Sequence, residues 1–209
     1  MKRIIPDILI LIAFVAPVMA GTALEEVNTK FTYKNKPIHP FLIGEFIGWM
    51  SDQRPIVTVV DVSAAFDTNE YPNSQVKRQY GQWWAVREER CFCGDLTEYD
   101  DFGYKWLGKM ADNVHVVEIG NGGGGSGYFM YLVFVKFSEG QTMWEGKKQE
   151  QLLMSLIGIY SLGDRYNGKI KVYQDKVIIY PSKYQFGGGS IDKKIELKFP
   201  EIVSRGEGE

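Results

Sequence analysis

Short apolar runs separated by turn-forming residues constrain the fold of this chain more than any other sequence feature. The strongest run is 128–137, where nearly every residue is aromatic or aliphatic, and the runs 56–62 and 114–119 are rich in β-branched residues. β-Branched and aromatic side chains fit the pleated, half-buried surface of a strand. These three runs therefore predict strands.

Further strand signals occur at 76–87 and near the C-terminus. There, 169–173 and 177–180 alternate polar and apolar residues around a Gln174-Asp175 turn, and 191–199 reads as a last strand. The inward-facing candidates of this meander are Ile170, Val172, Val177 and Ile179. Seven to nine strands at this spacing predict a mainly β chain, an antiparallel β-sandwich or barrel-like domain with one or two helices added.

Helical spacing is clearest after Pro40. This proline fits the first position of a helix, where its missing N–H costs no hydrogen bond, and apolar side chains recur at helical intervals as far as Trp49. The segment 149–160 is ambiguous, because its leucines fit a helix stripe while its glycine and the adjacent Ile-Tyr pair fit a strand; we expect a helix start that gives way to strand. The polar segments 21–30 and 63–75 predict a loosely held lead-in and a turn-rich loop.

The N-terminus has the three-part layout of a secretory signal peptide. A basic start at Lys2-Arg3 precedes an apolar run over 8–15, and small residues follow at 18–20. The apolar stretch is shorter than the roughly 20 residues that span a bilayer. We therefore expect 1–20 to be a cleavable signal peptide, cut after Ala20, rather than a membrane anchor.

Loss of the signal peptide leaves 189 of the 209 residues and changes the charge balance. The 24 basic and 26 acidic residues become 22 and 25, a formal net charge of −3. No Cys follows the apolar run to carry a lipid, and no second apolar span or low-complexity linker divides the remainder. We expect one soluble, unlipidated β-rich domain over 21–209, periplasmic or secreted and not bound to the membrane. So acidic a chain is not expected to bind nucleic acid.

The two cysteines, Cys91 and Cys93, are one residue apart. A disulfide between them would close a small, strained ring that stabilises little and is easily reduced. Half of a soft-metal site is a second interpretation, and two ordinary thiols on opposite faces of a strand are a third, which we favour. An oxidising compartment outside the cytoplasm leaves open whether the two cysteines are thiols or a disulfide.

The glycine run 120–127 matches G-x-G-x-x-G twice, starting at Gly120 and at Gly122. A dinucleotide-binding loop needs a helix directly after it, so that the amides of the helix N-terminus hold the pyrophosphate. Here the strand signal 128–137 follows instead. The run therefore predicts a loop between two paired strands, and we expect no cofactor.

An acidic stretch carries the oxygen ligands that calcium prefers, but it lacks the spacing of a calcium loop. Its members are Asp95, Glu98, Asp100 and Asp101. We interpret the stretch as solvated and expect no metal site.

Catalytic signatures are sparse. His39 and His115 are the only imidazoles, and neither lies in a nucleophile motif; His39 fits capping or packing at a helix start. A carboxylate pair for glycoside hydrolysis is an alternative, with Asp61, Glu118 and Asp164 on or beside strands. Such a mechanism depends on the separation of the two carboxylates, which the sequence does not contain.

Aromatic residues are unusually numerous, at 5 Trp, 12 Tyr and 12 Phe. Trp83 and Trp84 are adjacent, so on a strand they point to opposite faces and cannot share one core. An exposed Trp or Tyr suits stacking on a sugar ring or anchoring a protein partner. A sheet covered on both faces is the alternative, because it would bury both tryptophans.

Together these observations predict an exported, non-catalytic binding domain whose partner is an envelope or extracellular glycan or another protein. The candidate binding residues are Trp83, Trp84, His39, Asp164 and Arg165. Arg165 beside Asp164 also fits a local ion pair at a turn. The alternative function is a glycosidase-like hydrolase of cell-wall or extracellular polymers that uses the carboxylates named above.

Overall fold

The computed structural model describes residues 22–47, 57–72, 74–90, 96–122, 127–182 and 191–199, without the side chains of 86–90, 96–101 and Trp144. The predicted signal peptide 1–20, the pair Cys91 and Cys93, and the side chains of the acidic stretch 95–101 lie outside the described residues.

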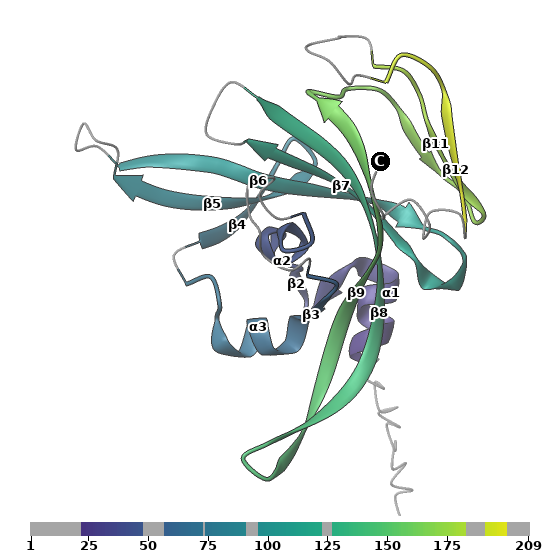
Figure 1. The fold of residues 1–209 in the computed structure, drawn as a ribbon. Helices are drawn as coiled ribbons and strands as arrows, with labels where there is room; N and C mark the ends of the chain where they lie inside the picture. Colours follow the sequence, from purple (N-terminus) through teal and green to yellow (C-terminus); the bar gives the residue numbers. More distant parts are fainter. Residues whose placement is uncertain are drawn as a thin grey trace, which may run out of the picture.

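A seven-stranded antiparallel sheet, curled into a half-barrel, forms the centre of the molecule (Figure 1). Its strand order is β3-β9-β8-β7-β6-β5-β4, so β4 to β9 follow one another as hairpins. The strands are β3 (Val59–Asp61), β4 (Ser74–Gln79), β5 (Gln82–Arg90), β6 (Leu96–Lys109), β7 (His115–Gly122), β8 (Tyr128–Trp144) and β9 (Lys147–Asp164). The far ends of β8 and β9 pair only with each other and extend beyond the sheet as a two-stranded arm.

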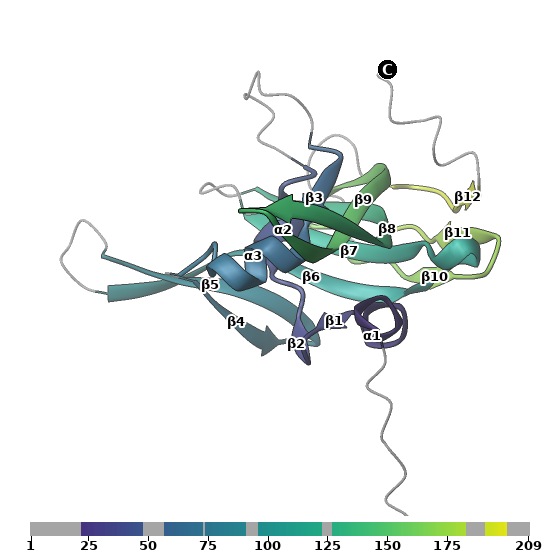
Figure 2. The same cartoon turned by 90° about the horizontal axis from the view of Figure 1, so that it is seen from below.

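Different elements cover the two faces of this sheet (Figure 2). One face carries three helices, α1 (Ala23–Lys30), α2 (Pro40–Gly44) and α3 (Val62–Thr68), with a small hairpin of β1 (Thr32–Tyr33) and β2 (Lys36–Pro37). The other face carries a three-stranded meander of β10 (Ile170–Val172), β11 (Lys176–Ile179) and β12 (Ile195–Lys198). We call these the helix side and the meander side.

Each side has its own hydrophobic core, and residues that alternate along one strand belong to different cores. On β7, Val117 and Ile119 lie in the helix-side core, whereas Val116 lies in the meander-side core. On β8, Val133 and Phe134 separate in the same way. Because both faces are buried, both sets of alternating positions must be apolar, which explains why 128–137 is an almost uninterrupted apolar run.

The structure confirms the mainly β fold class and its strongest strands. The runs 114–119 and 128–137 form much of β7 and β8, and the glycine run connects these paired strands, with Gly122 opposite Tyr128. The meander is confirmed as well: Val177 and Ile179 are fully buried and Ile170 and Val172 pack beside them.

Two segments expected to be irregular contain helices, because their polar residues cap the helix starts. The Thr22 hydroxyl accepts a hydrogen bond from the Glu25 N–H at the start of α1, and the Asp61 carboxylate accepts one from the Ala64 N–H at the start of α3. Such caps satisfy amides that the first turn leaves unpaired. The expected lead-in 21–30 is therefore largely α1, and the expected loop 63–75 begins with α3.

The segment 149–160 is strand throughout, which corrects the helix start expected there. It belongs to β9, which pairs with β8 from Phe129↔Asp164 to Trp144↔Lys147. Backbone hydrogen bonds to β8 along the length of β9, interrupted by two bulges, outweigh the weak preference of a few leucines for helix.

Three other boundaries also differ. The expected strand 76–87 is split into a hairpin by Tyr80-Gly81, whose φ angles of 50° and 77° fit a two-residue turn between twisted strands. The helix expected over 40–49 ends at Gly44, although Pro40 does begin it. Of the run 56–62, whose described part begins at residue 57, Val59–Asp61 form a strand and Val62 already begins α3.

Candidate functional site

A pocket of about 380 Å³ opens on the helix side, beside the β4 edge of the large sheet. Its walls combine aromatic rings, aliphatic side chains and four polar side chains, those of Lys36, Asn69, Glu70 and Ser74. The remaining lining residues are Pro37, His39, Leu42, Ala65, Phe66, Tyr71, Val76 and Trp83. We call it the Trp83 pocket. Its size lies within the range of small-molecule sites.

Trp83 reaches this pocket because of its position on β5. It packs against the helix-side core, and the neighbouring β4 strand places the Arg78 guanidinium over its ring, 5.5 Å from the centroid. A guanidinium held over an indole face is a favourable cation–π contact. The ring is therefore held at the pocket wall by contacts from two elements.

The start of α2 positions a second ring. His39 is the N-cap of this helix, and its Nδ1 accepts a hydrogen bond from the Phe41 N–H at 3.2 Å. The imidazole is also stacked on Tyr71, with ring centroids 4.6 Å apart and planes inclined by 24°. Capping and stacking together fix the orientation of His39, which confirms the capping expected from its place before Pro40.

Ser74 adds a hydroxyl to the same wall. Its Oγ is buried and has no hydrogen-bond partner among the described residues. A buried hydroxyl without a partner is costly, so such groups call for an explanation. Rotation about the χ1 bond would present this hydroxyl to a ligand in the pocket.

The five candidate binding residues divide between the two faces of the sheet. His39 and Trp83 come together in the Trp83 pocket. On the meander side, Trp84 lies beside Tyr128, with ring centroids 6.1 Å apart. The Tyr128 N–H donates to the Asp164 carboxylate at 2.8 Å, and this carboxylate also accepts from the Arg165 guanidinium at 2.8 Å. Asp164 and Arg165 thus form the ion pair at a turn that their adjacency suggested.

Two glycines explain how Trp84 and Tyr128 lie flat on the meander side. A Cβ on Gly103 would stand 2.6 Å from the Trp84 indole, and one on Gly120 would stand 1.9 Å from the Tyr128 hydroxyl. Both distances are far shorter than a van der Waals contact. The missing side chains let each ring cover the strand next to its own.

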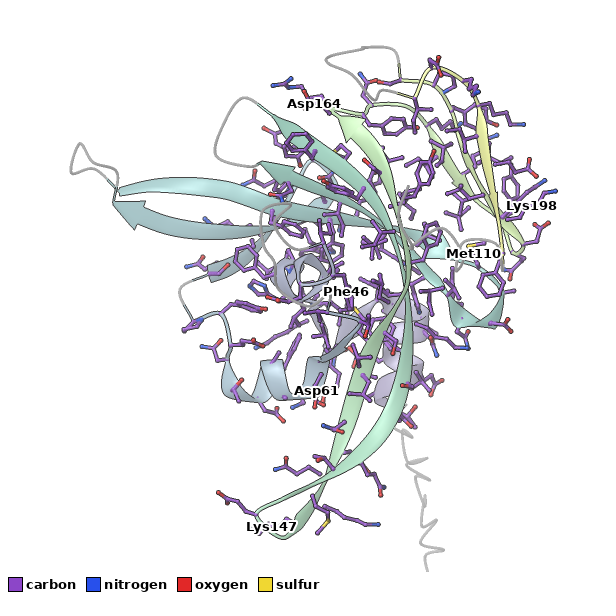
Figure 3. The ribbon with its side chains drawn as sticks, viewed as in Figure 1. Phe46, Asp61, Met110, Lys147, Asp164 and Lys198 are labelled. Carbon is purple, nitrogen blue, oxygen red and sulfur yellow. The ribbon has the colours of Figure 1, made fainter. Side chains whose placement is uncertain are left out.

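The structure separates Asp61 from Asp164, two of the three carboxylates named for a hydrolase. Asp61 pairs with Leu153 on β9, whereas Asp164 ends the same strand (Figure 3), roughly 35 Å further along at about 3.3 Å per residue. Glu118 lies on β7 opposite Leu132, where burial raises the pKa of its carboxyl against the effect of nearby Lys105. A glycosidase pair needs carboxylates within about 10 Å.

Asp61 also has a structural role. Its Oδ1 accepts from the Ser63 hydroxyl at 2.7 Å, and its Oδ2 accepts from the Gln151 amide at 2.6 Å. Together with the cap to Ala64, these bonds join α3 to the long hairpin.

Sequence reasoning missed Phe66, Tyr71 and Ser74. Phe66 lies in α3 and Ser74 begins β4, two elements that the polar composition of 63–75 concealed. The one available signal was Tyr80-Gly81, a turn that would have divided 76–87 and placed β4 beside Trp83.

No group of three or more His, Cys, Asp or Glu side chains converges within the described part of the chain. Over the same residues, none of the helices has the length and apolar content that crossing a membrane requires. Comparison with protein families, curated proteins and solved structures finds no match for this chain.

Proposed function

We propose that this protein is an exported, non-catalytic binding domain that holds a sugar unit of an envelope or extracellular glycan in the Trp83 pocket. The observation that carries the proposal is the pairing of flat aromatic walls with polar groups in one small pocket. Export follows from the signal-peptide layout of 1–20, and the periplasm and the extracellular space are its two destinations.

The chemistry of the walls suits a sugar ring. A pyranose has apolar C–H faces and a rim of hydroxyls, so it stacks on aromatic rings while its edge makes hydrogen bonds. The Trp83 and Tyr71 rings supply the stacking surfaces. The Lys36 ammonium is a hydrogen-bond donor, the Glu70 carboxylate is an acceptor, and the Asn69 amide is both. A protein anchor would instead need a wider apolar surface around the pocket.

The adjacent tryptophans give a matched pair of variants. The protein is purified from the medium or periplasm of expressing cells, and its mass is expected to match a chain that begins at Gly21. It is then screened against immobilised glycans. A glycan that binds is then titrated calorimetrically. Trp83→Ala is expected to weaken binding by about tenfold or more, because it removes a stacking face at the centre of the site.

Trp84→Ala is the control, since it removes the same side chain from the opposite face of the same strand. It is expected to leave the glycan affinity unchanged, and a thermal melt of both variants checks that they are folded. Absence of binding to any glycan, or equal losses in the two variants, would contradict the proposal and would turn the search to a protein partner.

A further inference from the structure

A second group of aromatic side chains surrounds Phe31, the residue that ends α1, in the same helix-side core that Trp83 packs against. Four rings lie 5.3 to 6.0 Å from the Phe31 ring, measured between centroids. They belong to Tyr104, Trp106, His115 and Phe137. The Trp106 ring is stacked parallel to Phe31, while Tyr104 and Phe137 meet it edge-on. We call these four side chains the Phe31 cage.

The cage contains polar atoms that its apolar occupant does not satisfy. The Tyr104 hydroxyl, Trp106 Nε1 and His115 Nδ1 are all buried, and none has a hydrogen-bond partner among the described residues. Tyr104 and His115 have no exposed surface at all. Three such atoms on neighbouring rings are unusual, because buried polar groups in folded proteins are almost always paired.

These atoms offer a defined pattern of donors and acceptors. Burial raises the pKa of Tyr104 far above its ordinary value, so its hydroxyl keeps its proton. Burial lowers the pKa of His115 to about 4, so its imidazole is neutral near pH 7. His115 Nε2 lies 3.1 Å from the Asn28 side-chain oxygen, and if Nε2 donates there, Nδ1 is an acceptor. Trp106 Nε1–H is a donor.

Phe31 fills the cage from the end of a helix. It is the C-cap of α1 and takes the left-handed conformation, with φ 57° and ψ 38°, which is costly for a bulky residue and usually left to glycine. Val27 is the only buried residue within α1. Neither α1 nor Phe31 belongs to a strand of the large sheet, so moving them would break side-chain bonds such as Asn28 to His115 but none of the ladder bonds of that sheet.

We propose that the Phe31 cage is a binding site for a flat aromatic ring bearing a hydroxyl or ring N–H, and that α1 with Phe31 is a displaceable plug in it. The ligand ring takes the place of Phe31 against Trp106, and its polar edge pairs with His115 Nδ1 and with the Tyr104 hydroxyl. The cage shares no lining residue with the Trp83 pocket, although Tyr104 lies opposite Trp83 on the neighbouring strand, and the proposal does not depend on glycan binding.

The test compares phenol with benzene, which have the same ring and differ in one hydroxyl. Phe31→Ala vacates the cage in the full exported chain, and the affinity of each probe is measured by NMR titration. An ordinary apolar cavity prefers benzene, because phenol loses hydrogen bonds to water on entering it. We expect the reverse, with phenol binding about tenfold tighter than benzene.

Two further measurements keep the proposal falsifiable. Adding Tyr104→Phe to Phe31→Ala removes one oxygen, and the phenol preference is expected to fall several-fold while benzene affinity holds. In the wild-type protein, phenol is expected to accelerate hydrogen exchange of the α1 amides, a result that needs no variant to fold. Trp84→Ala serves as the control, with phenol binding unchanged, because Trp84 lies beside Tyr128 on the meander side of the sheet.

Equal affinities for phenol and benzene, or a phenol preference that survives Tyr104→Phe, would contradict the proposal that the cage binds a polar aromatic ring. Unchanged exchange of α1 at phenol concentrations that fill the cage would overturn the plug. Neither result affects the glycan proposal, which is tested at other residues.

Discussion

The two faces of the large sheet differ in how they treat polar groups. On the meander side, the Tyr166 hydroxyl is buried in an aliphatic core, but it donates to the Tyr180 carbonyl at 2.7 Å. On the helix side, the polar atoms of Tyr104, Trp106 and His115 are buried without partners among the described residues. The buried tyrosine hydroxyl of the meander-side core is thus hydrogen-bonded, whereas these three side chains of the helix side retain unmet hydrogen-bonding capacity.

Pockets and cover show the same contrast. The three-stranded meander covers one face of the large sheet, while three short helices cover the other, one of them five residues long. The Trp83 pocket and the Phe31 cage both lie on the helix side. Short elements joined by loops leave gaps that a continuous sheet would close, which explains why the Trp83 pocket opens on this side.

The largest expected effect compares one phenylalanine from each face. Phe134→Ala opens a cavity in the meander-side core, where Phe134 is fully buried, and should lower the free energy of unfolding by about 4 kcal/mol. Phe31→Ala should cost about half as much, because α1 can relax and the cage polar atoms gain access to water. Urea denaturation measures both, and equal losses would contradict the difference between the faces.

The pH dependence of stability tests His115. Its pKa of about 4 in the folded protein lies below the ordinary 6.5, so the unfolded chain binds the proton more tightly. The stability that His115 contributes is complete above pH 6.5 and is lost as the pH falls from 6.5 to 4, by up to about 3 kcal/mol at 1.36 kcal/mol per pH unit.

His115→Gln should flatten this part of the pH profile, since the amide does not titrate. The groups that face His115 are Asn28 from α1, the rings of Phe31, Trp106 and Phe137, and the charge of Lys109. None of these described side chains carries a negative charge, so no ion pair among them offsets the cost of burying the imidazolium. A slope that persists in the variant would assign the titration to another group.

The smallest effect concerns two tyrosine hydroxyls. Tyr104→Phe should raise the free energy of unfolding by about 1 kcal/mol, because it removes a buried hydroxyl that lacks a partner. Tyr166→Phe should lower it by about the same amount, because it breaks the bond to the Tyr180 carbonyl. Thermal melts of the two variants measure both changes. A stability change of the same sign in both would contradict the difference between the two faces.

The strands could be predicted where burial on both faces produced continuous apolar runs, as at 128–137. They could not be predicted where pairing with a neighbour supplied the preference, as at 149–160 in β9. The helices α1 and α3 were missed because each is short and depends on an N-cap and on a few contacts with the sheet. Isolated helices of that length are not stable in water, so their composition carries little signal.

For the candidate sites, the sequence correctly predicted that Trp83 and Trp84 face opposite sides of the sheet, since adjacent strand residues must do so. It had no means of showing that His39 joins Trp83, whereas Trp84 lies beside Tyr128. The Phe31 cage could not be predicted for the same reason: its members come from β6, β7 and β8, Phe31 follows α1, and they meet only in the folded chain.

The sequence by itself determined the strand-rich class, the alternation of faces and the predicted export of this protein, because these depend on local composition and on the period of two along a strand. Tertiary structure alone decided which face the helices cover, which rings share a pocket and which polar atoms are left without partners. Those properties depend on strand order, register and contacts between distant residues, and no local pattern in the chain encodes them.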